Sequence, residues 1–90
     1  MSIELTFLVN SKAQWYCEAI VKEMQNHFGI SEKEAVDRIN DFWSHNDLTD
    51  DMDIMYHESP EFWAYQMYSD DQYWWRISKE EIIPRKYKET

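Results

Sequence analysis

The sequence holds one cysteine and one glycine among its 90 residues, and each scarcity excludes a class of protein. Because Cys17 has no second cysteine to pair with, the disulfide-rich secreted scaffolds are excluded and a reducing cytoplasm fits best. Because Gly29 stands alone, no glycine-rich phosphate loop can form, which excludes the nucleotide-dependent enzymes that use one. The chain also lacks a signal peptide and any run approaching the ~18–20 apolar residues of a membrane span. We therefore expect a soluble, cytoplasmic protein with no membrane contact.

Core-forming residues are plentiful in spite of a formal net charge of −9. Hydrophobic residues make up 43% of the chain and aromatic residues 17%, which is too much for a disordered acidic tail. Each large ring can bury roughly 150–250 Å² on folding, so the rings compensate for the small core of a short chain. We expect one folded helical domain over residues 1–90 that needs no disulfide or cofactor.

Residues 3–28 have the spacing of one long helix that ends at the only glycine. Apolar residues recur three and four positions apart, as they do on one face of an α-helix. Gly29 stands where a helix end favours a left-handed residue. The apolar alternation over residues 3–9 leaves a second interpretation open, in which a short strand precedes a helix that begins at a capping box of Ser11 and Gln14. We favour helix throughout.

A second helix is predicted to follow the capping box formed by Ser31 and Glu34, with apolar residues at helical spacing as far as Trp43. The turn around Gly29 is short, so the two helices are predicted to form an antiparallel hairpin. Residues 46–57 show no clear period and are rich in aspartate, which indicates a loop. The apolar side chains that can pin this loop to the core are Leu48, Met52, Ile54 and Met55.

The C-terminal third predicts one or two shorter helices. Ser59 is a suitable N-cap, and a proline at the first helical position starts a third helix over about residues 60–68. Residues 69–72 interrupt it and can cap a last short helix over residues 73–77, with a strand over the same stretch as the alternative. Residues 85–90 are predicted to be a loosely held, flexible basic tail. The expected fold class is all-α, a helical hairpin plus one or two short aromatic-rich helices.

The charge is concentrated between Arg38 and Arg76, where there is no lysine or arginine. We call residues 39–75 the acid–aromatic segment. It carries the whole net charge of −9, because the nine acids elsewhere balance nine bases. Its acids are Asp41, Asp47, Asp50, Asp51, Asp53, Glu58, Glu61, Asp70 and Asp71. Ten of the fifteen aromatic residues lie there too: Phe42, Trp43, Tyr56, Phe62, Trp63, Tyr65, Tyr68, Tyr73, Trp74 and Trp75.

Two interpretations of the acid–aromatic segment are open. In the first, the rings form the core and the acids are its solvated face. In the second, the segment is a docking surface for a basic protein, with tyrosine and tryptophan as anchors and carboxylates that steer the encounter. The candidate binding residues are then Asp47, Asp50, Asp51, Asp53, Glu58, Glu61, Tyr65, Tyr68, Asp70, Asp71, Trp74 and Trp75. Direct binding of nucleic acid is not expected, because this surface would repel phosphate.

Metal or acid–base chemistry is an alternative for part of the segment. His45, His57 and the aspartates between them are residue types that can ligate a divalent ion. Their spacing matches neither the His-Glu-x-x-His helix nor the calcium-loop template. His57 and Glu58 have no accompanying nucleophile or cofactor motif that would indicate catalysis. We therefore expect no catalytic residue, no metal ligand and no cofactor.

Several short runs stand in a distinctive order: residues 28–31, residues 35–40, Trp63-Ala64 after residues 57–60, and the pair Trp74-Trp75. Together they resemble an uncharacterised family of small bacterial proteins over most of the chain. The resemblance implies a bacterial origin and no particular activity.

The sequence therefore predicts a non-enzymatic, acidic protein-binding module. Its most concrete form is an inhibitor or immunity-type protein that masks a basic site on a partner, for example a nuclease. Two alternatives stay open. One is a metal-dependent enzyme that uses His45, the aspartates and His57. The other is a structural homo-oligomer in which the rings of Tyr68, Trp74 and Trp75 are buried against a second copy.

Overall fold

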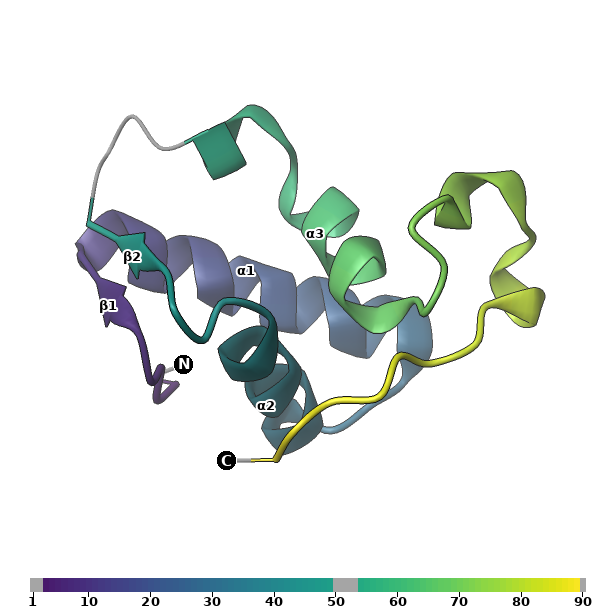
Figure 1. Ribbon diagram of the computed structural model, residues 1–90, viewed down its shortest axis with the longest axis horizontal. Helices are drawn as coiled ribbons and strands as arrows, with labels where there is room; N and C mark the ends of the chain where they lie inside the picture. Colours follow the sequence, from purple (N-terminus) through teal and green to yellow (C-terminus); the bar gives the residue numbers. More distant parts are fainter. Residues whose placement is uncertain (1–2, 50–53, 90) are drawn as a thin grey trace.

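The computed structural model describes residues 3–49 and 54–89, and the chain is mostly helical, as expected (Figure 1). The α-helices are α1 (Ser11–Phe28), α2 (Glu32–Phe42) and α3 (Pro60–Tyr68). The other described elements are the strands β1 (Leu8–Val9) and β2 (Asp47–Leu48) and the 3-10 turns η1 (Ile54–His57), η2 (Trp74–Arg76) and η3 (Lys79–Glu81). In Figure 1, α1 crosses the middle of the molecule, with α3 above it and α2 below. α1 packs against both of these helices.

α1 begins at Ser11, so the prediction of one helix from residue 3 is wrong and the alternative of an extended segment before the helix is correct in outline. The capping box predicted from Ser11 and Gln14 is wrong, because the N-cap is Asn10, whose side-chain oxygen accepts a hydrogen bond from the N–H of Ala13 at 2.8 Å. Residues 3–9 have the two-residue period of extended backbone, with Ile3 and Phe7 buried between more exposed neighbours. The apolar pattern fits both interpretations, and the Asn10 cap decides between them.

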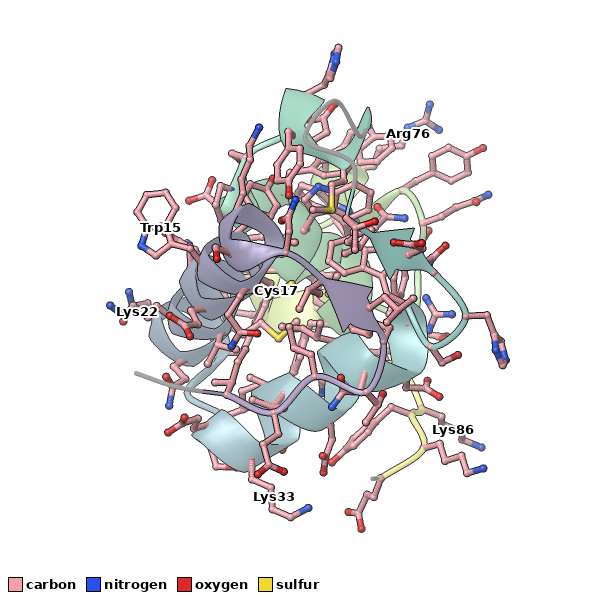
Figure 2. The ribbon with its side chains drawn as sticks, turned by 90° about the vertical axis from the view of Figure 1, so that its left-hand side faces the viewer. Trp15, Cys17, Lys22, Lys33, Arg76 and Lys86 are labelled. Atoms are coloured by element: carbon pink, nitrogen blue, oxygen red, sulfur yellow. The ribbon has the colours of Figure 1, made fainter. Side chains whose placement is uncertain are left out.

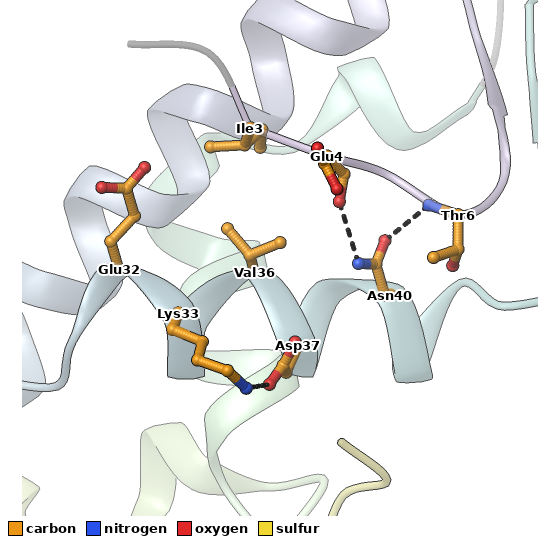
Figure 3. Close-up of a pocket in the computed structure, with 8 residues that line it drawn as sticks. All are labelled: Ile3, Glu4, Thr6, Glu32, Lys33, Val36, Asp37 and Asn40. Carbon is orange, nitrogen blue, oxygen red and sulfur yellow. Dashed lines mark hydrogen bonds and ion pairs between the residues drawn. The ribbon is translucent and has the colours of Figure 1, made fainter. Parts of the chain in front are cut away.

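Asn40 of α2 holds the extended N-terminal segment against the helices (Figure 3). Its Oδ1 accepts a hydrogen bond from the N–H of Thr6 at 2.9 Å, and its Nδ2 donates one to the carbonyl of Glu4 at 3.1 Å. Farther along, β1 pairs in parallel with β2, with Val9 opposite Leu48. The strand pair is too short to bond the N–H of Thr6 and the carbonyl of Glu4, and the buried Asn40 amide bonds both instead.

The predicted end of the first helix and the predicted boundaries of the other two are confirmed. α1 ends at Phe28, and the next residue, Gly29, has a φ of 65°, in the left-handed region that glycine adopts without strain. Ser31 caps α2 and Ser59 caps α3, each hydroxyl oxygen accepting a hydrogen bond at 3.1 Å from the N–H three residues on. α1 and α2 are joined through the short turn around Gly29, and their antiparallel arrangement as a hairpin stays a prediction.

The core lies where the three α-helices meet. Its buried residues from these helices are Ala13, Cys17, Ile20, Val21 and Met24 of α1, Ala35 and Ile39 of α2, and Ala64 and Met67 of α3. Cys17 is buried as expected, and Figure 2 shows it inside the molecule while Trp15 and Lys22 of the same helix point outward. Among the described residues, no helix is both long and apolar enough to cross a membrane.

Of the tryptophans in the acid–aromatic segment, Trp43 belongs to this core and Trp63 is half-buried against it. Trp43 is only 6% exposed, and its ring packs edge-on against Phe7 and Trp63, with centroids 6.1 and 5.3 Å away. The indole N–H of Trp63 donates a hydrogen bond to the carbonyl of Met55 at 2.9 Å. These two rings therefore support the interpretation of the segment as core.

The predicted loop over residues 46–57 contains β2 near its start and η1 at its end. Leu48 and Met55 are buried and pin it to the core, as predicted. The side chains of Met52 and Ile54 lie outside the described part of the chain. The same is true of three candidate binding residues, Asp50, Asp51 and Asp53.

The stretch after α3 follows the predictions made for it only in part. The last short helix predicted over residues 73–77 is present only as the 3-10 helix η2 over residues 74–76, and the alternative strand is wrong. The reason lies in the residues that were expected to cap that helix. The hydroxyl oxygen of Ser69 accepts from the N–H of Asp71 at 3.1 Å, and Oδ1 of Asp71 accepts from the N–H of Tyr73 at 2.8 Å. Such local bonds compete with helix formation.

The basic tail predicted over residues 85–90 is attached at its base, as far as the chain is described. The N–H of Arg85 donates to the carbonyl of Tyr68 at 2.7 Å, and the carbonyl of Arg85 accepts a hydrogen bond from the Arg38 guanidinium at 2.7 Å. The same guanidinium lies 4.4 Å from the ring centroid of Tyr87. Arg38 thus joins the tail to α2.

Candidate functional site

The chain leaves the end of α3 and returns beside it, which makes residues 70–83 a closed loop. The N–H of Asp70 donates to the carbonyl of Ile83 at 2.8 Å, and Ser69 and Pro84 form an antiparallel bridge just below. Loops with adjacent ends of this kind are often functional. In Figure 1 it is the green to yellow excursion beyond α3.

Trp74 fixes this loop to α3. Its ring stacks on that of Tyr65, with centroids 4.8 Å apart and planes 23° apart, and its indole N–H donates to the Gln66 side chain at 3.0 Å. The neighbouring Trp75 makes edge-on contacts with Trp74 and Tyr73 and is 56% exposed. Trp74 therefore anchors the loop to α3, and Trp75 beside it is exposed to solvent.

An acidic hollow of about 270 Å³ opens on one side of the loop. Its lining is Asp70, Asp71, Ile77, Glu81 and Ile83. The three carboxylates are exposed, and the two isoleucines add apolar wall. A lysine or arginine side chain has the matching composition, a long apolar stem that ends in a cation.

A second, aromatic hollow of about 300 Å³ lies beside it, and Ile77 lines both. Its lining is Glu61, Tyr65, Trp74, Trp75, Ile77, Lys79 and Ile82. Tryptophan and tyrosine rings attract cations through their faces. Burial raises the pKa of the Tyr65 phenol, and the nearby Glu61 and Glu80 carboxylates add to the rise, so this ring stays neutral.

We call the lining of the acidic and aromatic hollows together the docking surface. The chain from residue 61 to 83 carries five carboxylates and two cations, Arg76 and Lys79. The guanidinium of Arg76 lies over the ring of Tyr73, 4.9 Å from its centroid. This part of the chain therefore keeps a formal charge of −3, in agreement with the acidic character expected for the segment.

Six of the predicted binding residues meet on the docking surface: Glu61, Tyr65, Asp70, Asp71, Trp74 and Trp75. The charge pattern indicated these six residues, and their role in binding stays a prediction, but the pattern ended at Arg76. It therefore missed Ile77, Glu81 and Ile83, which complete the acidic hollow. The acidic pair Glu80–Glu81 was the available signal, but it stands among cations in the sequence.

Three other predicted binding residues lie apart from it or serve the fold. Tyr68 is half-buried, stacks on Phe28 with centroids 3.9 Å apart, and carries the Arg38 guanidinium 4.7 Å above its ring. Asp47 belongs to β2, at the opposite end of the molecule in Figure 1. Hydrogen bonds from Thr49 hold the pKa of the Asp47 carboxyl below its usual range. Glu58 is exposed just before α3.

Trp15 is an exposed ring that sequence reasoning left out. It lies on α1 and is 75% exposed, and Figure 2 shows it pointing away from the body of the molecule. Its position one residue before the half-buried Tyr16 places it off the apolar face of α1. The helical period alone could have identified it as a surface residue.

The alternative of a metal-dependent enzyme centred on His45 and His57 gains no geometric support from the described residues. Both histidines are exposed. Neither belongs to the one group of three potential metal ligands that occurs among the described residues. Asp47 lies outside that group as well.

The hollow in Figure 3 is larger, about 510 Å³, but its polar groups already serve the fold. The Asn40 amide bonds the N-terminal segment, as described above, and the buried Asp37 carboxylate accepts a hydrogen bond from Lys33 at 2.7 Å. The hollow follows the seam between the extended segment and α2. We interpret it as a structural feature.

Comparison with models of protein families, with curated proteins and with solved structures found no match for this chain. Its function is therefore inferred from its own residues.

Proposed function

We propose that this protein is a non-enzymatic binding module whose docking surface holds a basic segment of another protein. The observation that carries the proposal is the acidic hollow, where Asp70, Asp71 and Glu81 stand beside Ile77 and Ile83. A cationic side chain entering it would meet carboxylates for its head and apolar walls for its stem. Arginine fits better than lysine, because its planar guanidinium can bond two carboxylate oxygens at once.

The aromatic hollow supplies the second part of the recognition. Trp75 is exposed and edged by Trp74, so a partner can cover it without unfolding the core. Buried tryptophan and arginine contribute most to binding at protein interfaces, while surrounding charges steer the encounter. A segment with an arginine next to an apolar residue would use both hollows, since Ile77 joins them.

The concrete form that we propose is an inhibitor or immunity-type protein. Its carboxylates would take the place of phosphates on a partner whose own task is to bind nucleic acid, such as a nuclease. A reducing cytoplasm as its place of action rests on the single cysteine, Cys17.

The test uses the full chain and a hexa-arginine peptide as the probe, with hexa-glutamate as the negative control, and binding is measured by calorimetry. The variant Asp70→Asn/Asp71→Asn removes two charges but keeps the Asp71 side-chain oxygen that accepts a hydrogen bond from the N–H of Tyr73. The matched control, Glu4→Gln/Glu32→Gln, removes two exposed charges elsewhere.

We expect the first variant to weaken peptide binding about tenfold and the control by at most about twofold, because only the former removes groups that contact the cation. Binding by the wild type should weaken at high salt. Equal losses in the two variants would mean that the peptide senses only net charge, and the proposed site would be wrong.

A homo-oligomer that uses the same rings is the competing function, and Trp75 is its best anchor. Tyr68, which that alternative needs at the interface, already stacks on Phe28 inside the protomer. Light scattering over micromolar concentrations separates the two functions, because the docking module should stay monomeric until a basic partner is added.

A further inference from the structure

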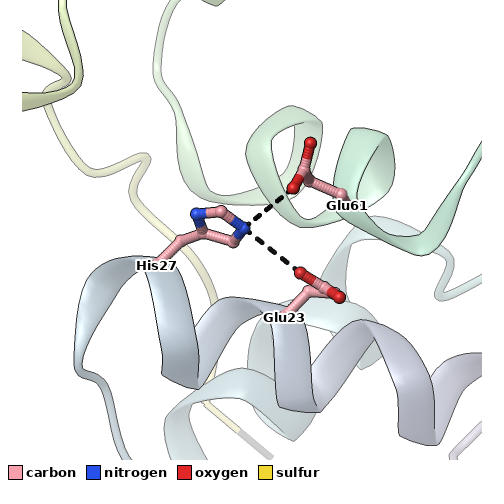
Figure 4. A group of neighbouring side chains, drawn as sticks. All are labelled: Glu23, His27 and Glu61. Carbon is pink, nitrogen blue, oxygen red and sulfur yellow. Dashed lines mark hydrogen bonds and ion pairs between the residues drawn. The ribbon is translucent and has the colours of Figure 1, made fainter.

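Three potential metal ligands converge where the end of α1 meets the start of α3 (Figure 4). Glu23 and His27 lie one turn apart on α1, and Glu61 lies in the first turn of α3. His27 Nε2 is 3.2 Å from Oε2 of Glu23 and 3.1 Å from Oε2 of Glu61. The three ligand atoms lie within 4.8 Å of one another, and no other such group occurs in residues 3–49 and 54–89.

A fourth residue orients the imidazole. The hydroxyl of Tyr65 lies 3.2 Å from Nδ1 of His27, and the two ring centroids are 5.1 Å apart. Tyr65 is itself held between Phe28, edge-on at 5.0 Å, and the stacked Trp74. Metal-ligating histidines usually bond a neighbour through the second ring nitrogen, which fixes the ring and its tautomer. Here that bond directs Nε2 toward both carboxylates.

We propose that Glu23, His27 and Glu61 form a binding site for a first-row divalent metal ion, with Zn²⁺ as the test ion. Zinc holds nitrogen and oxygen ligands at 2.0–2.2 Å, so two ligands of a tetrahedral ion lie roughly 3.3 Å apart. The two distances from Nε2 to the carboxylate oxygens are close to this value. An ion can therefore enter between these groups with small side-chain movements.

The donor set and its exposure suit an open site. One imidazole and two carboxylates match zinc and its first-row neighbours, whereas calcium and magnesium prefer oxygen alone. Three protein ligands leave a fourth position, and the Glu61 side chain is 61% exposed, so that position faces solvent. Sequence reasoning missed the group because Glu61 is 34 residues from His27.

The bound ion would link two helices and reach the docking surface. It would join the end of α1 to the start of α3 and would stabilise the fold by binding only the native state. Glu61 also lines the aromatic hollow, so it is the one ligand that the two sites share.

The experiment measures Zn²⁺ binding to the full chain by calorimetry, with Mg²⁺ as a control ion, for the wild type and four variants. Glu23→Gln and His27→Gln remove ligands, and Tyr65→Phe removes the orienting hydroxyl. The control, His45→Asn/Glu58→Gln, removes an exposed imidazole and an exposed carboxylate outside the group. The melting temperature of each variant without metal shows whether it folds.

We expect one Zn²⁺ per chain and a higher melting temperature with the ion. Glu23→Gln and His27→Gln should lose at least about a hundredfold in affinity, Tyr65→Phe about tenfold, and the control nothing. In the wild type, the imidazole resonances of His27 should shift on addition of Zn²⁺, and those of His45 and His57 should not.

Unchanged affinity in Glu23→Gln, a shift at His45 or His57 in place of His27, or no binding at millimolar Zn²⁺ would each overturn the metal site. Glu23 lies outside the docking surface, so failure of the metal site leaves the proposed function untouched. Likewise, Asp70→Asn/Asp71→Asn should bind Zn²⁺ as the wild type does.

Discussion

The backbone N–H of Asp70 donates a hydrogen bond to the carbonyl oxygen of Ile83, at 2.8 Å, and this bond joins two walls of the acidic hollow. It closes the loop over residues 70–83 directly above the end of α3. A carboxylate and an apolar side chain that are far apart in the sequence are thereby held side by side. The acidic hollow depends on this closure, whereas α3 supplies Glu61 and Tyr65 to the aromatic hollow.

Substitution of the exposed Trp75 should mainly weaken peptide binding, whereas substitution of the buried Trp43 should mainly lower stability. Trp75→Ala should change the free energy of unfolding by less than about 0.5 kcal/mol, because the ring is mostly exposed, but should weaken hexa-arginine binding about tenfold. Trp43→Ala should cost about 3–5 kcal/mol of stability, because that ring is in the core. Urea unfolding and peptide titration measure the two effects. A large stability loss in Trp75→Ala would show that this ring belongs to the fold.

Asn40→Ala should destabilise the protein by about 1–3 kcal/mol, measured by urea unfolding. The substitution leaves the N–H of Thr6 and the carbonyl of Glu4 without the bonds that the amide now provides. Asn40→Asp is the informative partner variant, because it keeps the acceptor for Thr6 and loses the donor for Glu4. If Asn40→Ala were as stable as the wild type, the extended segment would not depend on this amide.

Ser59→Ala should cost about 1 kcal/mol, because Ser59 caps the helix that carries Glu61 and Tyr65. Thermal or urea unfolding gives the value. Ser44→Ala is the control, since Ser44 is exposed and follows the end of α2, and it should have almost no effect. Equal effects of the two substitutions would contradict the role of Ser59 as a cap.

Stability should fall at alkaline pH through Cys17. Burial raises the pKa of its thiol from 9.0 to about 12, with a smaller contribution from Glu18. Between these values the unfolded chain loses the thiol proton and the native state keeps it, so the free energy of unfolding falls as pH rises. The slope is at most about 1.4 kcal/mol per pH unit for one group.

The measurement for this prediction is urea unfolding at pH 7 to 10.5. Cys17→Ala should be less stable at pH 7, because it leaves a small cavity, but its loss above pH 9 should be shallower than that of the wild type, so the difference in stability should shrink as pH rises. Identical slopes would rule out the thiol as the cause. Alkylation of native Cys17 at pH 8 should also be much slower than in urea.

Local signals predicted the helices well. Ser31, Gly29 and Ser59 each act within a few residues of their own position, and the helix ends they indicate are the ones observed. The N-terminal segment was harder, because its apolar residues satisfy two periods at once. The Asn10 side chain caps α1 and so sets where the helix begins. A search for apolar periodicity does not detect a single polar capping residue.

The candidate site could be predicted only in part. The charge pattern found Asp70, Asp71 and Trp75 but could not show that the chain folds back to bring Glu81 and Ile83 beside them. That closure depends on backbone hydrogen bonds, which a pattern of side chains does not indicate. The sequence also could not separate buried rings from exposed ones, because the burial of Trp43 depends on contact with Phe7, which is far from it in the sequence.

The five indole N–H signals give the most direct measurement of the central claim, that the docking surface binds a basic segment. In a titration of the ¹⁵N-labelled protein with hexa-arginine, followed by NMR, the signals of Trp74 and Trp75 should shift together with the amides of residues 70–83. The signals of Trp43 and Trp63 should stay in place, because Trp43 lies in the core, Trp63 is half-buried against it, and neither lines the docking surface. Trp15 should also stay in place, although it is the most exposed of the five. A shift at Trp15 with none at Trp74 and Trp75, or small shifts spread evenly over all acidic parts of the chain, would contradict the account.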